Sequence, residues 1–395
     1  MCIRDSFNPP EAGDFDETTG VMRRYGVAFA AATRSGELTF TAEDLFHEND
    51  ATTLFHDRFG AAHLLTEPDI ASPWLQYAAR SILLAESYTP WVASPDAVVA
   101  VARGLAGNPE IAAGLLVGRD AVDTLLRRST MLGRDEAPAI GDALVAAVMD
   151  SSDRAAAARI AAATITAIGG EGALPHGDVM TRVAVIGGAY LDEIAWSLVA
   201  FEHDPTYRPR FEIARGTARR FLLETVQNAE AYAVILAATQ VWIANVIAAE
   251  EPTTFADYTR RINNRADDIG MLLATIIGAD RINGVENAAE IAYRRAMLLD
   301  AIGGVVRMAA TLAGPAAAVV QPSADLLEDR ATDLLGTDPF AEATAENDAF
   351  REMVLDRLRT ALHEIIVDLE MDGPEAELDP QTLAEQQGAV LMQIL

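Results

Sequence analysis

The sequence of 395 residues contains no lysine, and all 30 basic residues are arginine. This absence excludes every site that needs a lysine amine, including the P-loop lysine, the kinase lysine and the Schiff-base lysine. The single cysteine is Cys2. The rest of the chain therefore has no thiol for a disulfide, a cysteine nucleophile or a zinc–thiolate site. A Gly-x-Ser-x-Gly nucleophile motif is also absent, which argues against a hydrolase of that type.

The excess of negative charge excludes a second group of functions. The 59 acidic residues exceed the basic ones enough to give a net charge of −29, with a sequence pI near 4.4. A field of this sign repels phosphate backbones and anionic membranes, so we expect no nucleic-acid partner and no membrane partner. Half of the residues are hydrophobic, which is enough for a sizeable core. We expect protein partners, or other domains of the same polypeptide, and no cofactor.

Residues 1–6 read Met-Cys-Ile-Arg-Asp-Ser, a string that resembles translated sequencing-adapter DNA. We therefore interpret them as a non-native leader and leave them out of the fold prediction. The chain also ends within a helical pattern, so we expect both native termini to lie beyond it. The expected localisation is the cytoplasm, or export without a cleaved signal peptide.

Helix signals dominate the chain. Serine or asparagine precedes proline at Pro73, Pro95 and Pro109, which is typical of a capping side chain followed by the first helical residue. Long Ala- and Leu-rich stretches separate these signals, and strand-like alternation is almost absent; even Val183 and Ile186 fit better in a helix over residues 178–201. The predicted fold is all-α, a multi-helix array in two packed lobes without significant sheet.

Loop-forming residues divide this array. Two prolines in His203-Asp204-Pro205-Thr206-Tyr207-Arg208-Pro209 separate two helical patterns, and the glycines of residues 169–172 predict a helix stop and connector. The predicted divisions are an N-terminal lobe at 7–204, a C-terminal lobe at 205–320, a loose connector at 321–347, an amphipathic helix at 348–372, and an acidic tail with a short helix at 373–395.

A cluster of ionisable residues lies between residues 43 and 63. His56 and His63 are seven apart and would share a face of a continuous helix, with Glu43 and His47 just before them. Imidazoles and carboxylates could together bind a divalent metal. No established ligand spacing is present, and partly buried or surface histidines near helix ends are the simpler explanation. If these four side chains converge, the chain is an enzyme of unknown type.

Arginines concentrate between residues 208 and 220. Arg208, Arg215 and Arg219 have the spacing of one helical face and form a candidate ligand-binding site, because guanidinium groups suit carboxylate or phosphate. Ion pairing within so acidic a chain is the simpler alternative.

The most hydrophobic stretch is 297–320. Asp300, Arg307 and Pro315 interrupt it, and the apolar runs are shorter than the roughly 20 residues that a membrane span needs. We predict a buried core helix that ends near Pro315, and a membrane-active effector is the alternative.

Short motifs along the chain resemble a known family. They are Asn8-Pro9, Gly26-Val27-Ala28-Phe29-Ala30-Ala31-Ala32-Thr33, Phe55-His56-Asp57-Arg58, Ser94-Pro95-Asp96, Gly107-Asn108-Pro109, Gly141-Asp142-Ala143-Leu144 and Asn228-Ala229-Glu230-Ala231-Tyr232. Over residues 7–320 they resemble an uncharacterised helical domain family of high-GC Gram-positive bacteria. That family occurs in large proteins with WXG-type secretion modules and polymorphic-toxin architectures.

The resemblance implies a helical region without assigned catalytic residues. It implies a non-enzymatic scaffold or interaction region of a larger secretion- or toxin-associated bacterial protein. Two features of such proteins are missing: no tryptophan begins a Trp-x-Gly turn, and no tyrosine is followed four positions later by Asp or Glu. Under this hypothesis both features lie outside the present chain.

Overall fold

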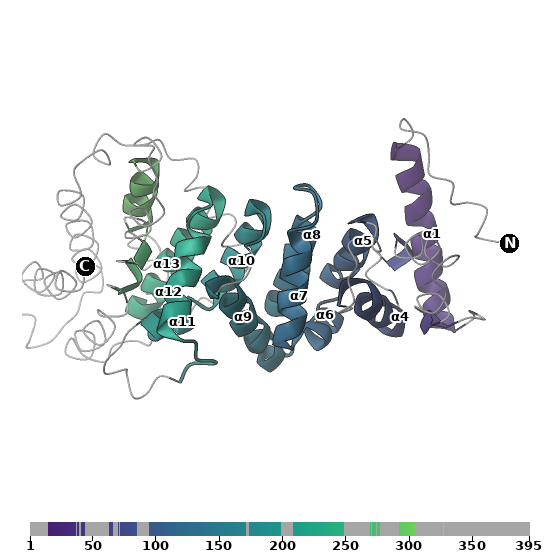
Figure 1. The fold of residues 1–395 in the computed structure, drawn as a ribbon, viewed down its shortest axis with the longest axis horizontal. Helices are drawn as coiled ribbons and strands as arrows, with labels where there is room; N and C mark the ends of the chain where they lie inside the picture. Colours follow the sequence, from purple (N-terminus) through teal and green to yellow (C-terminus); the bar gives the residue numbers. More distant parts are fainter. Residues whose placement is uncertain are drawn as a thin grey trace, which may run out of the picture. The chain divides into compact units, whose positions relative to one another are not determined.

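The computed structural model describes residues 15–36, 38, 41–43, 63–65, 70, 72–84, 95–170, 174–198, 208–248, 269, 271–273, 275–276, 292–302, 304 and 327. Of these residues 82% are helical and none is in a strand (Figure 1). The prediction of an all-α fold is therefore confirmed. Contacts divide the chain into two compact units. Unit 1 is Met1–Ala167 with Ala173–Arg182, and unit 2 is Ile168–Gly172 with Val183–Leu395.

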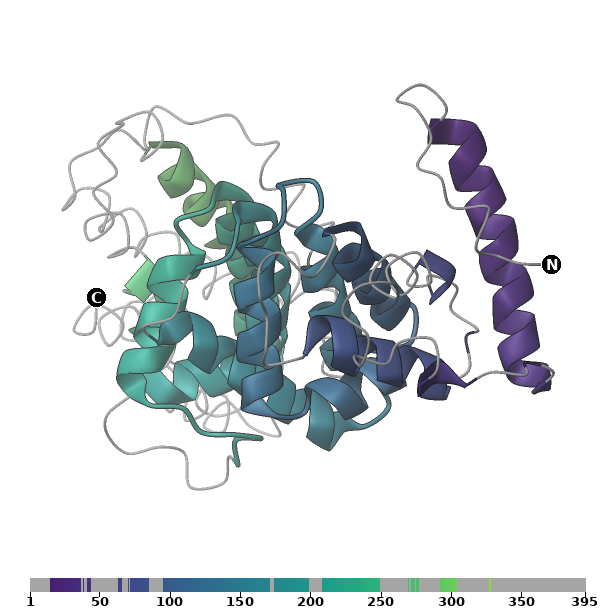
Figure 2. The same ribbon diagram turned by 45° about the vertical axis from the view of Figure 1, so that its right-hand side comes forward.

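The described helices of unit 1 pack mainly on helices that are near them in sequence. Its described elements are α1 (Phe15–Ser35), η2 (His63–Leu65), α4 (Ser72–Ala78), η3 (Ala79–Leu83), α5 (Pro95–Ala106), α6 (Pro109–Leu116), α7 (Arg119–Ser129), α8 (Pro138–Val145), η4 (Ala146–Asp150) and most of α9 (Arg154–Gly169). Both η3 and η4 are π-helical turns that continue an α-helix. Helix α5 packs on α8, and α6 on η4. Helix α1, purple in Figure 2, contacts η2, and Phe29 meets Trp74 edge-on at 5.3 Å between ring centroids.

Two of the three prolines that were predicted to begin helices do so. Pro95 and Pro109 are the first residues of α5 and α6, whereas Pro73 is the second residue of α4. At the first helical position a proline loses no hydrogen bond, because the N–H of that residue has no intrahelical acceptor. The capping prediction for Asn108 is wrong. Its side chain makes no bond to the start of α6, and Nδ2 instead donates to the Gly104 carbonyl oxygen at 2.8 Å. Because α5 ends only two residues earlier, this amide satisfies an orphan carbonyl of α5.

Unit 2 is built around a helix that is buried on every side. Its described helices are the end of α9, most of α10 (Gly177–Ala189), α11 (Leu191–Leu198), α12 (Arg215–Thr225), α13 (Ala229–Ala248) and the helical residues 292–302. This helix is α13, in which every side chain from residue 231 to residue 244 is buried. An apolar surface all round is typical of a central core helix. None of the described helices is both long and apolar enough to cross a membrane.

The helix predicted over 178–201 is broken, so a single continuous helix is wrong. Helix α10 ends at Ala189, and α11 begins at Leu191. A Cβ atom on Gly187 would lie 2.5 Å from Phe221 Cζ, and one on Gly188 would lie 2.7 Å from Ala238 Cβ. The glycine pair therefore lets α10 approach α12 and α13 closely. Glycine pairs are also common positions for a sharp kink in a helix.

Only some of the remaining predicted segments and boundaries fall on residues that the structure describes. Helix α9 ends at Gly169, so the predicted helix stop is confirmed. Contacts divide the chain between residues 167 and 183, whereas the predicted boundary near 205 lies outside the described residues. Within 297–320, residues 297–302 are helical and all but Asp300 are buried, in agreement with a core helix. The segments 321–347, 348–372 and 373–395 lie outside the described residues, except for buried Leu327.

Candidate functional site

The three arginines of the predicted ligand site do not share one helical face. Arg215 and Arg219 lie one turn apart on α12, and both are exposed. Arg208 is also exposed but precedes α12, in a segment without helical structure, so its assignment to that face is wrong. The physical reason is Pro209, because the residue before a proline is driven out of the helical region.

The predicted metal cluster lies almost entirely outside the described residues. Only Glu43 has a described side chain, and it is exposed; His47, His56 and the His63 side chain are among the residues left out of the description. Over the part of the chain that is described, no group of three or more His, Cys, Asp or Glu side chains could hold a metal ion. The metal site therefore stays a prediction.

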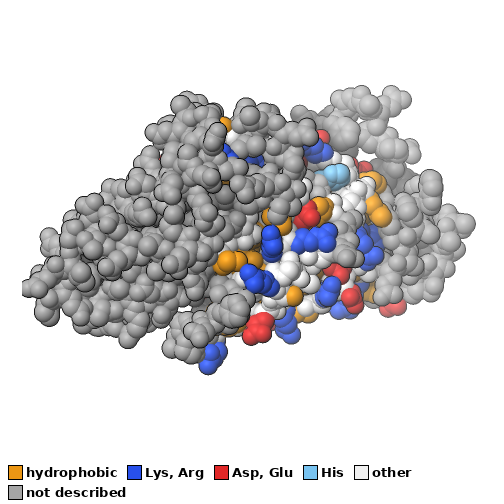
Figure 3. Space-filling view, turned by 60° about the vertical axis from the view of Figure 1, so that its left-hand side comes forward, with side chains coloured by type: hydrophobic (Ala, Val, Ile, Leu, Met, Phe, Trp, Pro, Cys, Tyr) orange, Lys and Arg blue, Asp and Glu red, His pale blue; other side chains and the backbone are white. Residues whose placement is uncertain are grey.

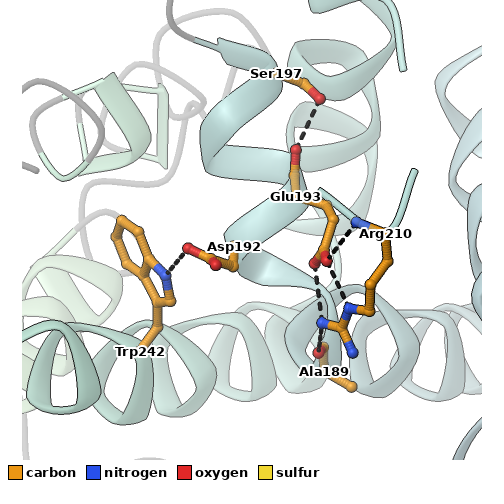
Figure 4. A network of polar contacts seen from close by, with 6 residues as sticks. All are labelled: Ala189, Asp192, Glu193, Ser197, Arg210 and Trp242. Atoms are coloured by element: carbon orange, nitrogen blue, oxygen red, sulfur yellow. Dashed lines mark hydrogen bonds and ion pairs between the residues drawn. The ribbon is translucent and has the colours of Figure 1, made fainter. Parts of the chain in front are cut away.

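A network of polar contacts in unit 2 surrounds α11 (Figure 4). Glu193 lies in the first turn of α11 and is only 1% exposed. Arg210 donates to both of its carboxylate oxygens, from Nε to Oε1 at 2.6 Å and from Nη2 to Oε2 at 3.0 Å. The Arg210 backbone N–H also donates to Oε1, at 3.4 Å. This two-pronged pairing is the strongest geometry that an arginine and a carboxylate adopt.

Aromatic rings support the same arginine. The Arg210 guanidinium lies 4.2 Å above the ring centroid of Tyr190, within the range of a cation–π contact. Tyr190 in turn packs against Phe211 at 5.4 Å between centroids. One residue before Glu193, Asp192 accepts a hydrogen bond at 2.8 Å from the indole N–H of Trp242 on α13. Two successive carboxylates of α11 therefore hold two different segments of unit 2.

A buried arginine joins the helical residues 292–302 to the end of α12. Arg294 is 2% exposed, and its guanidinium donates to the carbonyl oxygens of Val226 and Gln227, which follow α12 directly. Its own carbonyl oxygen accepts a hydrogen bond from the Tyr232 hydroxyl at 3.1 Å. The last carbonyls of a helix have no intrahelical donor and carry partial negative charge, so a cation is favourable there.

A third junction, in unit 1, uses an exposed carboxylate. Glu110 on α6 accepts from the Ser151 hydroxyl at 2.9 Å and from the Ser152 N–H at 2.7 Å. These bonds, led by the one from the Ser152 backbone, hold the pKa of Glu110 below its ordinary value of 4.5. The next residue, Asp153, accepts from the N–H groups of Ala155 and Ala156 and caps α9.

These three junctions hold structure together and leave their charged groups little capacity for reaction. The carboxylate of Glu193 is occupied on both oxygens, so it cannot act as a general base without breaking the ion pair. Sequence patterns did not identify Glu193, Arg294 or Glu110 as important. Arg210 belonged to the predicted arginine concentration, but its partner lies 17 residues earlier, beyond the spacing at which helical neighbours meet.

Comparison with known proteins adds no relative: no family model, no curated protein and no solved structure matches the chain. The resemblance drawn from the sequence motifs therefore stays a prediction.

Proposed function

We propose that the chain is a non-enzymatic helical scaffold or interaction region of a larger secretion- or toxin-associated bacterial protein. The observation that carries the scaffold part is the ion pair between the buried Glu193 and the half-exposed Arg210. Its charged groups have the chemistry of an active site but connect α11 to the segment before α12. Arg294 does the same between residues 292–302 and α12. Buried ionic groups that join elements are typical of a chain that holds one arrangement of helices.

The association with secretion or toxin delivery depends on the sequence resemblance alone. Its test is the reading frame that encodes the chain. Sequencing the genomic DNA on both sides should reveal, in the same frame, a WXG-type helical hairpin upstream of residue 7 or a toxin-like domain downstream of residue 395. A start codon directly before residue 7 together with a stop codon directly after residue 395 would overturn this part of the proposal.

The scaffold part has a separate test, because its rival is the enzyme hypothesis at Glu43, His47, His56 and His63. Equilibrium dialysis of the purified chain against Zn²⁺ should show no tight stoichiometric site. One tightly bound zinc per chain that is lost on His56→Ala and His63→Ala substitution would contradict the scaffold function. The matched control is His176→Ala, because His176 is an exposed histidine outside this group of four residues.

A further inference from the structure

A single guanidinium lies across the break between α10 and α11 (Figure 4). Nη2 of Arg210 is 3.5 Å from the carbonyl oxygen of Ala189, the last residue of α10. The same group stacks on Tyr190, the residue between the two helices, and donates twice to Glu193 in the first turn of α11. Ala189, Tyr190 and Glu193, here called the guanidinium cradle, therefore contact the charge, the flat face and the donors of one guanidinium.

The guanidinium cradle differs from the surroundings of other surface arginines. Arginine side chains lie on several parts of the described surface in Figure 3, and those of Arg119 and Arg220 pair with carboxylates that are 34% and 17% exposed. The Glu193 carboxylate is 1% exposed, although the Arg210 side chain that covers it is 45% exposed. A buried carboxylate regains little water when its cation leaves, so an empty cradle is strongly unfavourable.

Arg210 belongs to a segment before α12, residues 208–214, here called the strap. No residue of the strap is in a helix or strand, and exposed and partly buried residues alternate along it. Arg210 and Phe211 contact the cradle, the latter through its ring, 5.4 Å from the ring of Tyr190. Between Phe211 and Ile213, no hydrogen bond joins the strap to another described residue. Segments held by few backbone bonds open locally more readily than the core does.

We propose that the guanidinium cradle is an arginine-binding site, that Arg210 occupies it as an internal ligand, and that an arginine of a protein partner can replace Arg210. The proposal rests on the interaction-region part of the proposed function and specifies the chemistry of the partner. An arginine fits because its planar group donates to both carboxylate oxygens while it covers an aromatic ring. The net charge of −29 attracts basic partners.

Replacement by another arginine is more favourable than simple release of the strap. Release alone leaves the buried carboxylate of Glu193 without a cation, whereas exchange supplies a second guanidinium to the same oxygens. The strap is tethered, so Arg210 competes at an effective concentration near the millimolar range. A partner therefore needs contacts beyond its arginine to bind tightly, and a small arginine compound should act only at millimolar concentrations or above.

Chemical rescue of Arg210→Ala in the full chain tests the cradle. The substitution removes Cγ, Cδ and the guanidinium, which together correspond to ethylguanidinium. About 10 mM ethylguanidinium should raise the Tm of the variant by about 3–5 °C, the shift expected for a Kd near 1 mM. Ethylammonium at the same concentration supplies the charge without the planar group and should raise the Tm by less than about 1 °C.

Glu193→Gln together with Arg210→Ala is the matched control, because it keeps the space and removes the carboxylate. Ethylguanidinium should change the Tm of this double variant, and that of the native chain, by less than about 1 °C. If Arg210→Ala does not fold alone, recovery of its helical circular dichroism in ethylguanidinium but not in ethylammonium is the equivalent result.

A fluorescent label on the strap tests replacement of Arg210 in the intact cradle. In a Cys2→Ser background, Glu212→Cys carries the label at an exposed position of the strap. Gly216→Cys on α12 is the control, since a Cβ there meets nothing within 4 Å. A blocked pentapeptide with one arginine between glycines should lower the anisotropy at residue 212, with a midpoint on the order of 10 mM. The same peptide with lysine should not, and neither peptide should change the anisotropy at residue 216.

Two kinds of result would overturn the proposal. Equal effects of ethylguanidinium and ethylammonium, or a Tm shift that persists in the Glu193→Gln double variant, would mean that the cradle does not recognise a guanidinium. An anisotropy at residue 212 that stays constant, or that falls equally with the lysine peptide, would mean that no external arginine replaces Arg210. Neither result bears on the reading frame or on zinc binding, so failure here is distinguishable from failure of the proposed function.

Discussion

Replacing Arg210 should destabilise the chain more than replacing its partner Glu193. The carboxylate of Glu193 is 1% exposed, whereas the Arg210 side chain is 45% exposed. Arg210→Met leaves a buried carboxylate without its cation, and loss of such a partner costs about 3 kcal/mol even with some water entry. Glu193→Gln leaves a guanidinium that solvent can hydrate and an amide that can still accept from it, so we expect about 1 kcal/mol.

Urea unfolding followed by far-ultraviolet circular dichroism measures both losses. For a unit of this size, a loss of about 3 kcal/mol should lower Tm by roughly 6–12 °C. The double variant should be more stable than Arg210→Met alone, because the buried charge is then gone. Arg119→Met is the matched control: its ion pair with Asp123 spans 3.6 Å between side chains 65% and 34% exposed, and should contribute less than about 0.5 kcal/mol. If Glu193→Gln destabilises as much as Arg210→Met, the burial argument is refuted.

Three further predictions follow from packing and titration. Gly187→Ala should destabilise unit 2 by about 1–3 kcal/mol, because the new methyl group would lie 2.5 Å from Phe221 Cζ. Gly216→Ala, in open space on α12, should instead stabilise unit 2 by about 0.5–1 kcal/mol. Calorimetry of the two variants measures both effects. Arg294→Met should cost about 2–4 kcal/mol in urea unfolding, since two helix-end carbonyls lose their donor in a buried position. The lowered pKa of Glu110 means that its contribution to stability is present above pH 4.5 and is lost as the pH falls through its folded-state pKa. The difference in urea midpoint between the native chain and Glu110→Gln should therefore shrink between about pH 7 and about pH 3, and a constant difference would contradict the assignment.

Patterns confined to one helix were enough to predict the fold class. The prolines that begin α5 and α6 act through their own missing N–H. This effect does not require knowledge of a partner helix. The buried stretch of residues 297–302 was likewise predictable, because its composition alone favours a core position.

Features that depend on a second segment were not predictable in this way. Asn108 can cap either of two helices, and only the short link between α5 and α6 decides for α5. The break at Tyr190 follows Gly187 and Gly188, whose close approach to α12 and α13 involves residues far away in sequence. The ion pair of Glu193 was not predictable, because Arg210 lies 17 residues away in sequence. The metal hypothesis at Glu43, His47, His56 and His63 stays a prediction for a different reason, since most of those residues lie outside the description.

The contacts that join the helices of unit 2 use arginine in a way that lysine could not replace, which is consistent with the absence of lysine. Arg210 donates to two carboxylate oxygens while its planar group covers Tyr190, and Arg294 donates to two carbonyls with its guanidinium 5.4 Å from the Tyr232 ring centroid. Each junction needs a flat cation with several donors in fixed directions, which an ammonium group cannot provide. A chain with arginine as its only basic residue can form such junctions wherever a carboxylate or a helix end is buried. Arginines that join no described junction, such as Arg215 and Arg219, lie exposed on α12.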